Sequence, residues 1–142
     1  MKTYDLWLFD SVGEGDLNLS FGSSPRAVTG IEVLVNMFTL LFLTSIGSDL
    51  AHPEIGSEIG SVVNGNIGSS KTIFIDMVYT SVAEVVSTIS ESQDSSTPAD
   101  EFLSSVDILD VSISGTYLSV SVELESASGT TRTVIIPVQT LV

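Results

Sequence analysis

One long apolar stretch constrains the fold of this chain more than any other feature: residues 29–47 read TGIEVLVNMFTLLFLTSIG. The ends of the stretch predict a helix, because Thr29 and Glu32 have the spacing of a capping box and Gly47 stands where a helix C′ glycine is expected. Between these ends, apolar side chains recur at three- and four-residue steps and also occupy most positions in between. A helix that is apolar on nearly every side must be covered on nearly every side, by the rest of the chain or by another protein.

The same helix is the first candidate interaction surface. We expect a second protein to contact its apolar face through four residues, Met37, Phe38, Leu41 and Phe42. A membrane span is the alternative, but residues 31–46 number about 16, fewer than the roughly 20 that cross a bilayer, and they include Glu32 and Asn36. We therefore predict a core or interface helix and no association with a membrane.

The charge balance of the chain excludes several classes of function. Its 142 residues, enough for one domain with a core, carry 18 acidic side chains against 4 Lys and Arg, a formal charge of −14. Phosphate backbones and anionic membrane surfaces repel such a chain, so we expect no binding to nucleic acid, and a protein with basic patches is the natural partner. There is no cysteine and a single histidine, His52, so we expect no metal and no cofactor.

Hydrophobic patterns predict a hairpin before this helix and another helix after it. Residues 4–9 and 16–21 alternate around Gly13 and Gly15, which is typical of an N-terminal hairpin. The second helix is expected from Ser69 or Ser70 to about Ser92 and to bury a row of apolar residues, namely Phe74, Val78, Val82, Val85 or Val86, and Ile89. A polar linker with a proline follows and ends that helix.

The C-terminal third predicts a β-meander. Residues 102–113 change the phase of their alternation near Ile108–Leu109, which indicates a bulge. Residues 118–124 alternate cleanly, and residues 132–142 form a last strand in which Pro137 lacks the N–H that an inner strand donates. The last strand is therefore predicted to be an edge. The patterns together predict one α+β domain over residues 1–142, with two main helices packed on a mostly antiparallel sheet.

This edge strand is the second candidate interaction surface. Its residues 133–142, TVIIPVQTLV, carry no charged side chain, and an uncharged edge strand tends to recruit another strand. The expected partner contacts are Val134, Ile136, Val138 and Leu141. Deleting residues 133–142 is expected to leave a soluble domain that no longer makes this contact.

A spaced motif follows the first helix, and its fixed positions are Thr44, Gly47, Pro53 and Gly56. Residues 43–56 read LTSIG, then SDLAH, then PEIG. The segment resembles the baseplate wedge and sheath-initiator family of contractile phage tails, also called lysozyme-like baseplate proteins. In that family an apolar helix ends in a Leu-Thr-x-x-Gly turn, and a Pro-acidic-apolar-Gly turn follows at the same distance. The order of the later elements is also similar, so the resemblance covers about residues 29–138.

The resemblance implies a structural role without catalysis. It implies a subunit of the inner baseplate, assembled in the host cytoplasm and carried in the tail of the virion. Family members clamp other wedge proteins through their helices and initiate the sheath by lending a strand to its first ring. The implied partners are therefore wedge subunits and the sheath protein, with tube or hub proteins as further candidates. The chain differs from the family in having Ser48 and Asp49 where Glu-Arg is usual, and no arginine in residues 95–105, where Glu-Pro-Arg is usual.

Two alternatives come from other classes of function. The lysozyme-like label raises a peptidoglycan-degrading enzyme, which needs two carboxylates flanking a cleft, and Glu54 and Glu58 are the nearest pair. The Pro-x-x-Gly turn explains Glu54 without catalysis, and the chain has no nucleophile-elbow sequence, so we expect no catalytic residue. The other alternative is an acidic protein-binding module, whose affinity for a basic partner would fall steeply with ionic strength.

Overall fold

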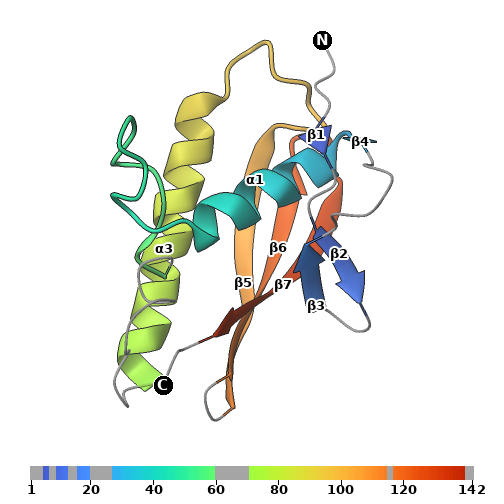
Figure 1. Ribbon diagram of the computed structural model, residues 1–142. Coiled ribbons are helices and arrows are strands. Elements are labelled where there is room, and N and C mark those ends of the chain that lie inside the picture. The colour runs from blue at the N-terminus through green and yellow to red at the C-terminus, as the bar shows by residue number, and fades with distance from the viewer. Residues whose placement is uncertain are drawn as a thin grey trace.

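The chain folds into a layer of two helices on a three-stranded antiparallel sheet, seen in a computed structural model (Figure 1). The structure describes residues 5–6, 9–12, 16–19, 27–59, 71–114 and 117–139. Strands β5 (Leu103–Ser114), β6 (Tyr117–Ser126) and β7 (Thr131–Gln139) form the meander in the order β5-β6-β7. Helix α1 (Ile31–Leu43) packs across β6 and β7, and helix α3 (Lys71–Ser92) packs on β5 and α1. The predicted α+β class is confirmed.

Short strands precede α1 in the described part of the chain. Strands β2 (Phe9–Val12) and β3 (Asp16–Leu19) form an antiparallel hairpin, although its first strand begins at Phe9 and not at residue 4 as predicted. Strand β1 (Asp5–Leu6) pairs separately with β4 (Ala27–Val28). The expected first strand is thus divided between two pairings. Gly13 and Gly15, the expected loop, lie outside the described residues. Strand β3 lies beside β7 but does not join its hydrogen-bonded ladder.

The start of α1 is stabilised differently from the sequence prediction. The N-cap is Gly30, with φ 67°, and no side chain caps the helix, so the predicted capping box of Thr29 and Glu32 is wrong. Glu32 instead forms an ion pair with Arg132 of β7. A carboxylate oxygen of Asp100 lies 3.2 Å from where a side chain on Gly30 would begin. A tertiary carboxylate therefore stands at the positive end of the helix dipole, in place of a local one.

The end of α1 also differs from the prediction. The helix stops at Leu43, and Thr44 is already extended, with φ −81° and ψ 129°. Gly47 is therefore not the C′ residue, although it does adopt a positive φ of 83°. Its role belongs to the loop that follows.

The core lies between the two helices and one face of the sheet. Phe38 and Phe42 of α1 are fully buried and stack with their ring centroids 5.7 Å apart. The predicted row of α3 is buried, and so are the inward residues of two strands, Leu118, Val120, Val122, Leu124, Val134, Ile136 and Val138. Most of α1 is thus covered by the chain's own sheet and by α3.

Helix α3 combines a buried row with an apolar composition. Among the described helices it alone is long and apolar enough to cross a membrane, with a mean hydropathy of 1.4 in its 18-residue window. Its buried residues pack in the core with α1 and β5, as expected of an amphipathic helix on a sheet.

The bulge predicted in β5 is present at Leu109. Ile108 pairs with Val122, and Asp110 pairs with Ser121, so Leu109 has no partner across the ladder. The extra residue lets the apolar residues on both sides of the bulge face the core, while Leu109 itself is 53% exposed.

The linker between α3 and β5 is held by the side chain of Gln93. Its amide nitrogen donates to the carbonyl of Glu101 at 2.8 Å, and its oxygen accepts from the N–H of Leu103 at 2.9 Å. Asp94 opens the next turn, where hydrogen bonds from the hydroxyl and N–H of Ser96 lower the pKa of its carboxyl group. The predicted linker is confirmed as an ordered connection.

Candidate docking surfaces

The four motif residues meet in one closed loop that runs from residue 44 to residue 57. The N–H of Gly47 donates to the carbonyl of Pro53 at 3.0 Å, which joins the two halves of the motif. The N–H of Ser57 donates to the carbonyl of Thr44 at 2.9 Å, and its hydroxyl donates to the carbonyl of Phe42 at 2.6 Å. The loop therefore closes on the last turn of α1 and satisfies carbonyls that the helix end leaves open.

Gly56 is required by space as well as by conformation. A Cβ on Gly56 would lie 2.6 Å from the carbonyl oxygen of Thr44 and 2.9 Å from the nitrogen of Ile46, and its φ is 123°. No side chain fits there, because the obstructing atoms are backbone. Gly47 differs, since a Cβ there meets nothing within 4 Å and only its φ of 83° favours glycine.

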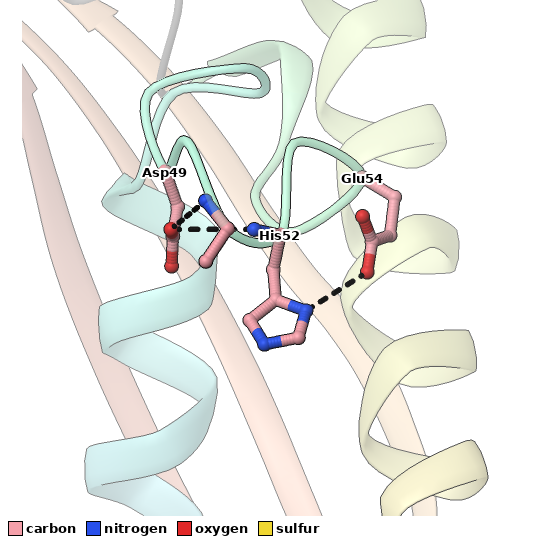
Figure 2. Close-up of polar contacts among 4 residues, drawn as sticks. Asp49, His52 and Glu54 are labelled. Atoms are coloured by element: carbon pink, nitrogen blue, oxygen red, sulfur yellow. Dashed lines mark hydrogen bonds and ion pairs between the residues drawn. The ribbon is translucent and has the colours of Figure 1, made fainter.

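The outer turn of this loop is held by Asp49 (Figure 2). Its carboxylate accepts from the N–H of Ala51 at 2.9 Å and from the N–H of His52 at 3.3 Å. His52 Nδ1 lies 3.5 Å from Glu54 Oε1, and both side chains are mostly exposed. Leu50, beside Asp49, is 97% exposed. Polar contacts within the loop thus hold its conformation, while the side chain of Leu50 is exposed to solvent.

The predicted contact residues on α1 divide into two groups. Phe38 and Phe42 were expected to meet a partner, but they fill the chain's own core, because that side of α1 lies on the sheet. Met37 and Leu41 are only partly buried. The prediction missed Leu40, which is 45% exposed and whose helical spacing from Met37 could have revealed it.

We call the C-terminal outward side of α1 the apolar strip, and it consists of Met37, Leu40, Leu41 and Leu43. None of these four side chains is charged, and none is fully buried. The only charged residue of α1 is Glu32, which is engaged by Arg132. An outward helix face without charge is a common feature of a protein interface.

The predicted contact residues on the last strand also need correction. Val134, Ile136 and Val138 are buried in the core, so they do not face a partner, and Leu141 lies outside the described residues. Removing residues 133–142 would take these side chains out of the core, so the truncated chain is not expected to remain a folded domain.

What β7 offers a partner is its backbone edge. Among the described strands, β7 is hydrogen-bonded only to β6. Its partly exposed side chains on the outer face include Ile135 and Pro137, which carry no charge. Strand β3 lies beside β7 without joining its ladder. Among the described residues of β7, an added strand would meet no charged side chain beyond Arg132.

The outer face of the sheet is acidic. It carries Asp107 and Asp110 on β5 and Glu123 and Glu125 on β6, and Asp107 stands directly opposite Glu123. Two carboxylates in register repel each other, so this face favours a cationic neighbour and disfavours an anionic one. The net charge predicted this preference but could not place it on the sheet.

The residues considered for catalysis lie on the open surface. Glu54 and Glu58 are exposed, and the N–H of Glu58 donates to a carboxylate oxygen of Glu84 at 3.2 Å. This arrangement does not desolvate either carboxylate, which is the usual way in which a protein prepares a general acid. Within the described ranges, no three metal-ligating side chains gather at one place.

Comparison of the chain with protein-family models, with curated proteins and with solved structures finds no match. Membership of the baseplate family therefore stays a prediction from the spacing of residues 43–56.

Proposed function

We propose that the chain is a structural subunit of the inner baseplate of a contractile phage tail. In this role it binds other wedge subunits through the apolar strip of α1, and it initiates the sheath by pairing the edge of β7 with a strand of the sheath protein.

The observation that carries the proposal is the closure of the loop at residues 44–57. The resemblance depends on four residues at fixed spacing. That spacing has a physical reason, because it allows the hydrogen bond from Gly47 to Pro53 and the close approach of Gly56 to Thr44. The motif closes a loop on the last turn of α1. This closure fixes the residue at which the helix ends and the side of the helix that faces outward.

Two features of the fold support an assembly role. The apolar strip leaves uncharged side chains in water, and burying a leucine fully contributes roughly 1.5–3 kcal/mol relative to leaving it exposed. The β7 edge provides backbone groups for strand addition, in which main-chain hydrogen bonds supply much of the affinity.

The test is to place a charge on the strip without disturbing the core. Leu40→Lys changes the exposed residue of the strip, and Ser104→Lys, on an exposed position of β5, is the matched control. Both variants are expected to fold, as judged by circular dichroism and thermal melting. In a phage that encodes the chain, Leu40→Lys is expected to stop incorporation of the subunit into tails, and Ser104→Lys is expected to leave it normal. Normal tails from Leu40→Lys would overturn the helix interface.

A second experiment separates this role from cell-wall degradation. The double variant Glu54→Gln and Glu58→Gln removes both candidate carboxylates from the surface. We expect tail assembly to be retained and wall lysis to be no different from wild type. Loss of lysis with normal assembly would favour the enzyme.

A further inference from the structure

The least expected feature of the surface is Leu50. Its exposure of 97% is the largest among the exposed large hydrophobic residues of the described chain, and it sits in a polar segment, SDLAHPE. A single exposed leucine on a flexible loop would need no explanation. Leu50 differs because its loop is fixed.

The loop around Leu50 is ordered by bonds that do not involve the leucine side chain. Asp49 accepts two backbone N–H groups on the far side of Leu50, and Gly47 is bonded to Pro53 across the base of the loop. The N–H of Ser48 also donates to the carbonyl of Ser45 at 3.1 Å. The loop is therefore ordered without burying Leu50, and it holds this residue at a position exposed to water.

Pre-organisation has a consequence for binding. Because the backbone around Leu50 is already held, covering this residue costs little conformational freedom beyond the rotamers of its side chain. More of the free energy of burying the side chain then appears as affinity. Covering a leucine completely is expected to strengthen an association by about tenfold to a hundredfold.

The charges of the loop indicate the kind of partner. Asp49 adjoins Leu50 and Glu54 lies on the same loop, and both side chains are exposed. The side chain of His52, which lies 3.5 Å from Glu54, is charged only when it is protonated. A partner that covers the leucine with an apolar pocket also approaches these carboxylates. Lys or Arg at the border of that pocket would be attracted to them, and Asp or Glu would be repelled.

We propose that Leu50 is an anchor that inserts into an apolar pocket bordered by Lys or Arg on another protein. Leu50 is part of neither the apolar strip nor β7, and the proposal goes beyond the baseplate role because the chemistry of the pocket follows from the loop alone.

The experiment uses the full chain with a photoreactive amino acid at position 50, irradiated in cells that express the chain with its natural gene neighbours. The matched control places the same group at position 109, where Leu109 is also an exposed leucine but stands on the bulge of β5. We expect position 50 to cross-link to one site on one protein, an apolar pocket with Lys or Arg at its border, and position 109 to give no such product. Cross-links from position 50 that are confined to this chain, are as diffuse as those from position 109, or map to an acidic surface would overturn the proposal.

Affinity measurements with the purified cross-linking partner complete the test. Leu50→Ser is expected to weaken binding about tenfold to a hundredfold, whereas Leu50→Met should stay close to wild type. Glu54→Gln should reduce the dependence of affinity on salt. Wild-type affinity of Leu50→Ser would contradict the anchor. The identity of the partner tests the baseplate role separately, since a pocket on a protein unrelated to tails would support the anchor and overturn that role.

Discussion

Strands β5 and β7 form the two edges of one sheet, yet their edges are built differently. β5 carries two aspartates, Asp107 and Asp110, and a bulge at Leu109 that interrupts its ladder. β7 has neither a bulge nor a charge in its central part, and its one cation, Arg132, is engaged with α1. Pro137 is the only residue of β7 that removes a backbone donor.

The difference indicates which edge is closed to other strands. Charges and bulges are the usual means of preventing an edge from pairing, and β5 has both. β7 lacks them although its inner residues Val134, Ile136 and Val138 are buried, whereas Val106, Ile108, Val111 and Ile113 of β5 are only partly buried. The edge of β7 is therefore not a sign of a poorly packed strand. We infer that β5 is the protected edge and β7 the edge that pairs with another strand, which has to fit beside β3, the strand next to β7 outside its ladder.

The largest expected effect tests whether β7 is a true part of the core. Ile136→Ala should lower the free energy of unfolding by about 2–5 kcal/mol, because Ile136 is fully buried. Ile135→Ala, on the opposite face of the same strand, should cost much less. Urea denaturation of both variants is the measurement, and equal losses would mean that the two faces of β7 are not distinguished by burial.

The next effect concerns the bulge that protects β5. Deleting Leu109 joins the two apolar phases into one regular alternation, so we expect a loss below about 1 kcal/mol and a greater tendency to associate through β5. Deleting Ser112 instead moves Ile113 to the outer face, which should cost about 1–2 kcal/mol. Thermal unfolding and light scattering measure the two quantities. If the two deletions are equally harmful, the bulge does not set the phase.

A smaller effect is expected at the one charge of β7. Arg132→Gln removes the ion pair with Glu32, whose side chains are 50% and 20% exposed, and should cost about 0.5–1 kcal/mol. The loss should shrink at high salt, because a partly exposed pair is screened. A double-mutant cycle with Glu32→Gln checks the coupling. A coupling energy of zero would show that Arg132 is not engaged with the helix.

The smallest effect on stability is expected for a charge on the outer face of β7, where the proposed effect on assembly is large. Ile135→Lys places a charge on the outer face of the open edge and should change stability by less than about 0.5 kcal/mol. It should nevertheless prevent the sheath initiation that we propose for this chain, as seen by electron microscopy of tails. Asp107→Lys on β5 is the control and should leave the sheath unaffected. Normal sheaths from Ile135→Lys would contradict strand addition at β7.

Much of the fold was predictable because it depends on local periodicity. The row on α3 from Phe74 to Ile89 and the phase change at Leu109 follow from spacing alone, and both are confirmed. The candidate surfaces were predicted only in part. Periodicity identifies an apolar face on α1 but cannot tell which arc of it the sheet covers. It therefore predicts a partner contact for Phe38, which lies in the core, and does not single out Leu40, which lies outside.

The sequence by itself determined the elements, their phases and the spacing of the motif at residues 44–56, because these depend on residues close together along the chain. Only the tertiary structure decided how α1 begins, since Glu32 pairs with Arg132 and Asp100 stands beside Gly30 across long separations in sequence. It also decided which apolar side chains remain outside. Packing can cover only the sides of α1 that the sheet and α3 reach, and that geometry leaves the apolar strip and Leu50 in contact with water.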